Sequence, residues 1–489
     1  MDSKKLIFLL LFICFVLFMT AAEDSFRMIP NGELSYHWQA YYGEDETMLD
    51  LICYKNGRVH WRYSHLDETF YDDRHEVPLT AYALYDGVLT FPLTLLQESG
   101  RLKRFQVALD GETGALLWEK ETSLGVAQNN LYSFYHEGRL YIHNLHEYKG
   151  AQLLCVDLKS GKTIWESEGP PEAAYPLFWG EKLVLPAGNL ARLYIYDSAG
   201  RLTDQKSSSS YPVIWRDSLV YLDYEADSVF LNIISDDRSS RYPLGGRAGE
   251  DFSIFSLSRS EDFKRHVTRS FIPFLIYDDK IFIQKERDGI SVLRAYELLN
   301  EGREGRSIEL PQQYKFGFRR DFYSGYALGY YMSKPPVQAY GKGNTGFSEG
   351  AVLPVLLYES HEVLEYTILN RLALIDLENY RVEIGEAGLY ESQFWASSIL
   401  NSQGTRYLLL ERNSESEKNN LLLRFSSDGT VDSWVEYPKD ITDNSVKGQD
   451  APYNYILLDR TDLVEWKPFD EGGLDELGEG LLPDAMLKQ

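Results

Sequence analysis

The sequence predicts an all-β fold of the β-propeller type, and three observations carry this prediction. The 489 residues include 35 Tyr, 24 Phe and 9 Trp, a composition that favours pleated, half-buried strands over helices. Two segments, Val107–Trp118 and Leu154–Trp165, align without a gap at a period of about 47 residues. No stretch has a convincing long helical period, whereas short alternating segments such as 280–284 suit strands. We therefore expect a single propeller of about eight, or alternatively seven, four-stranded blades.

The N-terminus has the features of an export signal. Lys4 and Lys5 precede an unbroken apolar run from Leu6 to Met19, and small residues follow as far as Ala22. The alternative is an uncleaved membrane anchor, because the apolar stretch is only a little shorter than the roughly 20 residues that span a bilayer. In either case we expect the body of the protein to be exported, to the periplasm or to the cell surface.

The two best repeats share a turn whose residue types have a common physical logic. An apolar strand runs into an aspartate that caps a tight turn, a glycine supplies a left-handed backbone position, and a second apolar strand carries tryptophan. The shared positions of the first copy are Asp110, Thr113, Gly114 and Trp118. Those of the second copy are Asp157, Ser160, Gly161 and Trp165. We interpret both sets as structural residues of the repeat.

Weaker copies extend the repeat along the chain. Trp61 ends an earlier copy, Trp434 ends a later one, and a copy around Asp197 has no tryptophan. Further degenerate copies are predicted at 229–244, 291–310 and 372–384. The predicted propeller therefore spans 23–466 and follows the signal peptide or membrane anchor at 1–22.

Three segments depart from this rhythm. Residues 245–270 are polar and charged, and residues 311–353 are rich in Gly and Tyr, so both are predicted to be loops inserted on a face of the propeller. Residues 467–489 are predicted to be an acidic, solvated C-terminal tail.

Tyrosines of the second insertion form a candidate interaction loop. A tyrosine ring has a rigid apolar face and a polar tip, which suits contacts with proteins or glycans. The residues concerned are Tyr323, Tyr326, Tyr330, Tyr331 and Tyr340. The alternative is that these rings pack beneath the loop and anchor it.

The charge of the chain limits its partners. The formal net charge is −25, which repels phosphate backbones and favours basic partners, so we predict no nucleic-acid binding. No residue pattern in the sequence predicts a catalytic, cofactor-binding or metal-ligating set. Cys53 and Cys155 are expected to be buried free thiols, and the protein is expected to be a monomer.

The pattern Ala-x-Asp-x-x-Thr-Gly-x-x-x-Trp at Ala108–Trp118 resembles the repeat of pyrroloquinoline-quinone (PQQ) dehydrogenase-like β-propellers. The resemblance implies that Trp118 and Trp165, and more loosely Trp61 and Trp434, dock between neighbouring blades. Quinone-dependent members of this family use a vicinal cysteine pair, a stacking tryptophan and calcium-binding side chains. This sequence has no two adjacent cysteines, so the resemblance favours the non-enzymatic branch.

The predicted function is a non-catalytic, exported propeller that serves as an interaction scaffold for envelope or extracellular proteins. Two alternatives stay open. One is a PQQ- and calcium-dependent dehydrogenase, which would hold a planar cofactor in its central channel. The other is a glycan-binding propeller that presents aromatic rings from residues 320–347. The main interpretation predicts no cofactor.

Overall fold

The computed structural model describes residues 30–31, 34–42, 47–56, 58–67, 83–96, 102–124, 131–146, 150–170, 176–187, 192–210, 212–226, 228–247, 252, 255–257, 269–271, 274–287, 290–311, 314–316, 351–359, 369–386, 389–390, 394–402, 405–412, 420–426, 428–437, 467–468 and 487. Within these residues all regular secondary structure is β-strand. The strands fall into two compact units that divide between Gly169 and Pro170.

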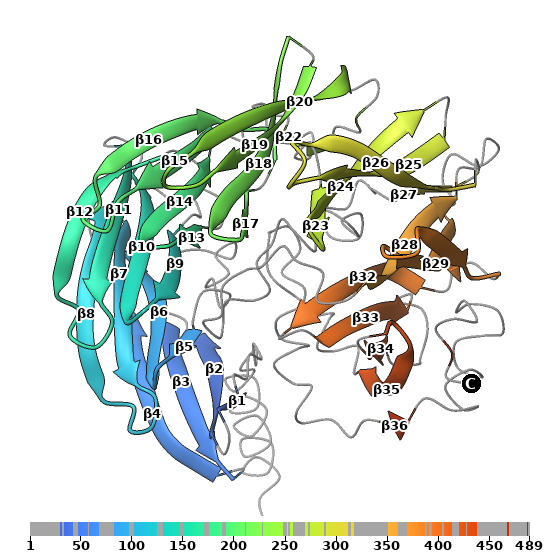
Figure 1. The fold of residues 1–489 in the computed structure, drawn as a ribbon. Helices are drawn as coiled ribbons and strands as arrows, with labels where there is room; N and C mark the ends of the chain where they lie inside the picture. The colour runs from blue at the N-terminus through green and yellow to red at the C-terminus, as the bar shows by residue number, and fades with distance from the viewer. Residues whose placement is uncertain are drawn as a thin grey trace, which may run out of the picture. The chain divides into compact units, whose positions relative to one another are not determined.

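The first unit contains three antiparallel four-stranded sheets, in each of which consecutive strands are neighbours (Figure 1). Sheet 1 is formed by β1 (Pro30–Asn31), β2 (Leu34–Tyr42), β3 (Thr47–Lys55) and β4 (Arg58–Asp67). Sheet 2 is formed by β5 (Ala83–Tyr85), β6 (Val88–Leu96), β7 (Leu102–Asp110) and β8 (Leu116–Leu124). Sheet 3 is formed by β9 (Leu131–His136), β10 (Arg139–His146), β11 (Gly150–Asp157) and β12 (Thr163–Gly169).

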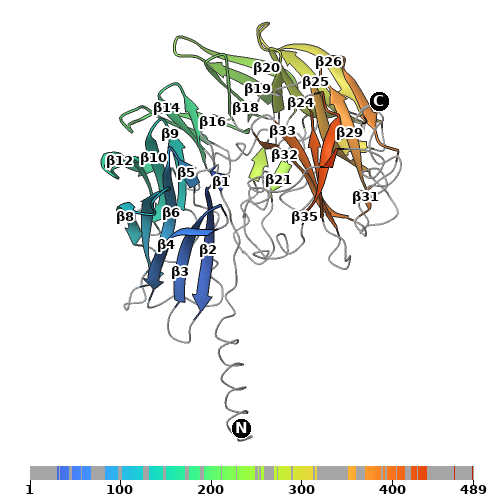
Figure 2. The same ribbon diagram turned by 90° about the horizontal axis from the view of Figure 1, so that it is seen from below.

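The second unit continues the same pattern, which Figure 2 shows from a second direction. Sheet 4 is formed by β13 (Leu177–Trp179), β14 (Lys182–Ala187), β15 (Arg192–Tyr196) and β16 (Leu202–Ser207). Sheet 5 is formed by β17 (Val213–Trp215), β18 (Ser218–Glu225), β19 (Ser228–Ile234) and β20 (Ser239–Arg247). Sheet 6 is formed by β23 (Phe274–Tyr277), β24 (Lys280–Arg287), β25 (Ile290–Glu297) and β26 (Arg303–Glu309).

Two five-stranded sheets complete the described part of the second unit. Sheet 7 is formed by β27 (Tyr314–Phe316), β28 (Val352–Glu359), β29 (Leu369–Asp376), β30 (Arg381–Ile384) and β31 (Leu389–Tyr390). Sheet 8 is formed by β32 (Phe394–Ser402), β33 (Thr405–Arg412), β34 (Asn420–Phe425), β35 (Val431–Tyr437) and β36 (Lys467–Pro468). A separate two-stranded sheet pairs β21 (Phe255–Leu257) with β22 (Arg269–Phe271), so the segment predicted as a loop at 245–270 contains strands.

The predicted fold class is confirmed. The described residues are all-β, and they form eight blade-like antiparallel sheets of four or five strands, the first of the two predicted blade counts. The signal segment at 1–22, the tyrosines predicted at 323–340 and most of the tail after 467 lie outside the described residues. No helix within the described part of the chain is long and apolar enough to cross a membrane.

The core of the first unit lies between neighbouring sheets. Strand β11 has four buried residues in succession, from Leu153 to Val156, as expected for a strand that is covered on both faces. Ala108 of sheet 2 belongs to the same apolar cluster as Leu140 and Leu154 of sheet 3. Sheets 2 and 3 therefore pack face to face, which brings residues far apart in sequence into register.

A β-bulge interrupts the pairing of the third and fourth strands in all three sheets of the first unit. After the bulge at the start of each fourth strand, tryptophan lies opposite a small residue: Trp61 pairs with Cys53, Trp118 with Ala108, and Trp165 with Cys155. A bulge changes the direction of the side chains that follow it, and in sheets 1 and 2 it precedes the tryptophan that docks on the next sheet.

Candidate interaction surface

The turn between β7 and β8 is held by its first aspartate. Asp110 Oδ1 accepts hydrogen bonds from Thr113 N at 2.8 Å, Thr113 Oγ1 at 2.8 Å and Glu112 N at 3.1 Å. These donors, chiefly the backbone N–H of Thr113, hold the pKa of Asp110 below its ordinary value of 3.8. The turn then closes at Gly114, whose φ of 69° is in the left-handed region.

Trp61 of sheet 1 docks on this turn of sheet 2. Its indole Nε1 donates to Gly111 O at 3.1 Å. A methyl group at Gly114 would lie 2.5 Å from Cδ2 of the same indole, so the ring lies directly against the glycine. The absence of a side chain at this turn thus permits both the backbone conformation and the close approach of the ring.

The same arrangement recurs between sheets 2 and 3. Trp118 Nε1 donates to Leu158 O at 2.8 Å, and a methyl group at Gly161 would lie 2.5 Å from Cγ of its ring. Asp157 caps the turn by accepting from Ser160 N at 2.8 Å and Ser160 Oγ at 2.6 Å, and these bonds lower its pKa. The predicted repeat residues therefore meet between neighbouring sheets, where the tryptophan of one sheet contacts the Asp-Gly turn of the next.

The other two predicted tryptophans are buried without this hydrogen bond. Trp165 and Trp434 are 9% and 5% exposed, and neither indole N–H makes a hydrogen bond within the described residues. Trp165 has an edge-to-face contact with Tyr141 at 5.8 Å between ring centroids. Lys467 Nζ lies 4.5 Å from the centroid of the Trp434 ring, a cation–π contact.

Beside each predicted tryptophan of sheets 1 and 3, the opposite strand carries a cysteine. Cys53 and Cys155 are both free and buried. Burial raises the pKa of each thiol to about 11, so the thiolate, which is the reactive form, is scarce at neutral pH. Both cysteines therefore act as small apolar residues of the core.

A second set of docks uses aromatic residues at the end of the first strand. In the second unit, Trp179 Nε1 donates to Asp217 O of sheet 5 at 2.7 Å, and Trp215 Nε1 donates to Asp279 Oδ1 of sheet 6 at 3.1 Å. In the first unit, the rings of Tyr85 and Tyr135 stack at 4.8 Å. The sequence analysis missed this set. Its signal is an aromatic residue directly before a two-residue turn, which recurs at Tyr85, Trp179, Trp215 and Tyr277.

Sheet 7 reverses the direction of docking. Tyr380 follows its capping residue Asp376 at the spacing that Gly114 has from Asp110, and it takes the left-handed backbone conformation with a φ of 57°. Its ring turns toward sheet 6, with Arg306 Cζ 4.7 Å from its centroid and the Phe282 ring centroid at 6.0 Å. Here the turn supplies the aromatic ring that earlier sheets receive from their neighbour.

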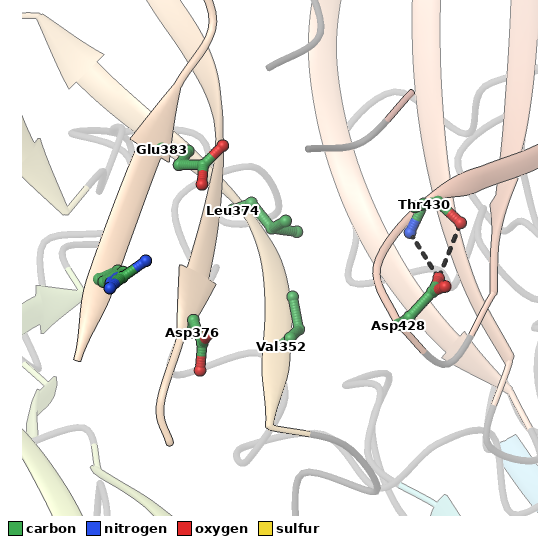
Figure 3. A pocket seen from close by; sticks show the side chains of 7 residues that line it. Val352, Leu374, Asp376, Glu383, Asp428 and Thr430 are labelled. Atoms are coloured by element: carbon green, nitrogen blue, oxygen red, sulfur yellow. Dashed lines mark hydrogen bonds between the residues drawn. The ribbon is translucent and has the colours of Figure 1, made fainter. Parts of the chain in front are cut away.

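A pocket of about 310 Å³ lies between sheets 7 and 8 (Figure 3). Glu383 pairs with Leu374, as Trp118 pairs with Ala108 in sheet 2, so a glutamate stands at the docking position. On the opposite side Asp428 accepts hydrogen bonds from Thr430 N and Oγ1 at 3.0 and 2.7 Å. The pocket is also lined by Val352, Asp376 and Arg381. The pocket thus lies between sheet 7 and the turn of sheet 8, at the place that a tryptophan ring fills between sheets 1 and 2 and between sheets 2 and 3.

The fourth strands of sheets 2 and 3 present the same exposed face. On β8 the exposed residues Leu117, Glu119 and Glu121 alternate with less exposed ones, and on β12 the exposed residues Ile164, Glu166 and Glu168 do the same. Leu117 is 39% exposed and Ile164 is 45% exposed, although both are aliphatic. We call these two sets the acidic edge faces. Each consists of one aliphatic side chain followed by two carboxylates.

The acidic edge faces are flanked by further aliphatic side chains at the bulges. Leu116 on β8 is 52% exposed, and Val59 holds the corresponding place on β4 of sheet 1 at 55%. Sheet 1 has Arg62 where sheets 2 and 3 have Glu119 and Glu166, so its fourth strand is not acidic. Single exposed aliphatic residues are common on protein surfaces. In sheet 3 the place of Val59 and Leu116 is taken by Thr163, so the aliphatic residue that recurs is the one directly before tryptophan on β8 and β12.

Two findings concern the alternatives that the sequence leaves open. The tyrosines of the candidate interaction loop, Tyr323 to Tyr340, lie outside the described residues. Within the ranges that the structure describes, no three His, Cys, Asp or Glu side chains are grouped so that they could hold a metal ion. The PQQ- and calcium-dependent alternative stays a prediction from the resemblance of the repeat.

Comparison with known proteins yields no family. No protein-family model and no curated protein matches the chain. A crystal structure of the eukaryotic initiation factor aligns with 12% identity and a TM-score of 0.36 over 85% of this chain and 88% of its own. The β-propeller domain of the trilobed protease from Pyrococcus furiosus aligns with 13% identity and a TM-score of 0.27, over 74% and 97% of the two chains. Kluyveromyces lactis Hsv2p aligns with 9% identity and a TM-score of 0.33, over 71% and 98%. All three TM-scores are below 0.5, so these alignments carry no argument about function.

Proposed function

We propose that this protein is a non-catalytic, exported β-propeller that acts as a protein-interaction scaffold in the cell envelope. The observation that carries the proposal is the pair of acidic edge faces on β8 and β12, which repeat one exposed arrangement on two neighbouring sheets. Aliphatic side chains that stay exposed at equivalent positions suit contact with another protein. The apolar run from Leu6 to Met19 supports export.

The repeat itself supports a scaffold role within the PQQ-like propeller repeat group. Trp61 and Trp118 dock on turns of the following sheets, and these contacts hold neighbouring sheets in fixed register. A rigid array of sheets keeps its outer strands at constant spacing, which a multi-point binding surface requires. Under this proposal the docks are structural and the outer strands bind partners.

Site-specific photocrosslinking in the native cell tests the proposal. A photoreactive amino acid at Leu117 or Ile164 should give adducts with envelope proteins, whereas the same probe at the exposed turn residue Asp237 should not. Fractionation of the same cells should place the protein outside the cytoplasm. Equal adduct patterns at all three positions would contradict the edge faces as the binding surface, and a cytoplasmic location would contradict export.

A further inference from the structure

We propose that the acidic edge faces of β8 and β12 each bind one extended, basic segment of a partner protein, which adds to the sheet as an antiparallel strand. This inference rests on the proposed function and deepens it, because it names the chemistry of the partner and the mode of binding. It follows from three properties of these strands: a free edge, an alternating exposed face and a strong bias of charge.

The edges of β8 and β12 are available for pairing. Within the described residues β8 pairs with β7 alone and β12 pairs with β11 alone, so each is the last strand of its sheet. An edge strand presents a row of backbone N–H and C=O groups that a further strand can bind. A bulge lies at the start of each strand, with Leu117 and Ile164 as its extra residues. The regular pairing that follows, from Trp118 to Glu121 on β8 and from Trp165 onward on β12, includes both glutamates of each face.

The exposed side chains define what the added strand must carry. Side chains of directly opposed residues on neighbouring strands lie close enough to interact. A strand antiparallel to β12 would place successive side chains of one face opposite Glu168, Glu166 and Ile164 in that order. The complementary sequence is therefore basic-x-basic-x-aliphatic. The same pattern fits Glu121, Glu119 and Leu117 of β8.

Charge also argues against a second copy of this chain as the occupant. If two β12 strands paired antiparallel about Glu166, that carboxylate would face its own copy and Ile164 would face Glu168. Like charges directly opposite one another destabilise a strand pair. The net charge of −25 adds a general repulsion between copies. A basic partner is instead attracted both by the glutamates opposite its own side chains and by the negative net charge of the chain.

Glu166 is held in place on this face. Its carboxylate accepts a hydrogen bond from Gln152 Nε2 of the adjacent strand β11, yet the side chain stays exposed. Between the two strands, Lys120 Nζ donates to Thr163 Oγ1 at 2.6 Å and to Gly161 O at 3.3 Å. This contact ties the middle of β8 to the start of β12, so the two faces lie on neighbouring strands that contact each other.

Calorimetric titration of the full chain with synthetic peptides tests the proposal. The probe is a peptide in which Lys, Lys and Ile alternate with Thr in the order given above, and two peptides should bind per chain. Glu166→Lys with Glu168→Lys should remove one site and leave the other unchanged, and Glu119→Lys with Glu121→Lys should do the converse. The four-residue variant should bind about tenfold more weakly or not at all.

Matched controls separate strand addition from general charge attraction. Asp237→Lys with Glu309→Lys changes the net charge by the same amount at exposed positions elsewhere and should leave binding intact. A peptide N-methylated at alternate residues keeps its charges but cannot pair with an edge, so it should not bind. Thermal unfolding should show that every variant is folded.

The outcomes distinguish the two proposals. Binding of the N-methylated peptide, or equal loss in the Asp237 and Glu309 control, would overturn strand addition. Absence of peptide binding would also overturn it, and would mean that the glutamates only protect bare edges from association. In that case crosslinks from Leu117 and Ile164 could still be present, and the scaffold function would stand. Dimerisation of the chain that is lost in the four-residue variant would identify a second copy as the occupant instead.

Discussion

At the scale of single residues, two turn glycines differ in why they must be glycine. Gly87 is required only for its left-handed backbone conformation, whereas Gly114 must also leave room for a neighbouring ring. Gly87 and Gly114 have φ values of 77° and 69°, but a methyl group at Gly87 would meet nothing within 4 Å, whereas one at Gly114 would lie 2.5 Å from the Trp61 ring. We expect Gly87→Ala to lower the free energy of unfolding by about 1 kcal/mol, the cost of a left-handed alanine. Gly114→Ala should cost about 1–3 kcal/mol more, because the indole must move. Urea unfolding measures both, and equal losses would contradict the docking of Trp61.

The capping aspartates make a prediction about acid stability. Hydrogen bonds from Ser160 lower the pKa of Asp157 below 3.8 in the folded protein. The stabilisation from its ionised form is therefore complete above that value and is lost as the pH falls through the lower, folded pKa. Asp157→Asn should be less stable than the native protein at neutral pH, and the difference should shrink in strong acid. Thermal midpoints across pH check this, and a difference that grows in acid would contradict it.

At the scale of elements, equivalent tryptophans on β8 and β12 differ in one hydrogen bond. Trp118 Nε1 donates to Leu158 O at 2.8 Å, whereas the Trp165 indole N–H makes no hydrogen bond within the described residues. Trp118→Phe should lower the free energy of unfolding by about 1–3 kcal/mol, because it leaves a buried carbonyl without its donor. Trp165→Phe should cost clearly less. Equal urea midpoints for the two variants would show that the indole hydrogen bond adds nothing to the dock.

Some contacts between neighbouring sheets could be predicted from the sequence and others could not, and the difference has a physical cause. The Asp-Gly-Trp set was predictable because each residue type has a local cause, namely a cap, a left-handed turn and a bulky apolar ring. Tyr380 escaped prediction because its ring takes the reverse role at the position of a glycine. Glu383 escaped because β29 and β30 pair without a register shift, so counting along the chain does not show which residue stands opposite Leu374. Pairing register across strands is a long-range property.

At the scale of the whole molecule, composition and period were enough to predict an all-β fold of about eight sheets, but they did not identify the candidate surface. The exposed faces of β8 and β12 depend on which strand is last in its sheet. Leu117 and Ile164 lie directly before the tryptophans of the repeat, on strands that the sequence analysis described only as apolar. Their exposure depends on the bulge at the start of each fourth strand, since one residue of displacement along a strand exchanges its two faces.

The balance of charge over the molecule predicts how salt affects stability. With a net charge of −25, repulsion among the acidic side chains destabilises the compact state. Ion pairs such as Lys182 with Asp236 and Arg216 with Asp279 stabilise it, but each contributes little because the side chains are partly exposed. Salt screens both effects, and we expect the repulsion to be the larger sum because acidic residues outnumber basic ones by 74 to 49. Raising the ionic strength from about 0.01 M to about 0.15 M shortens the Debye length from about 30 Å to about 8 Å. The thermal midpoint should then rise by about 2 °C or more, the shift that corresponds to about 1 kcal/mol. Scanning calorimetry over this range checks the sign, and a midpoint that falls would mean that the surface ion pairs outweigh the repulsion.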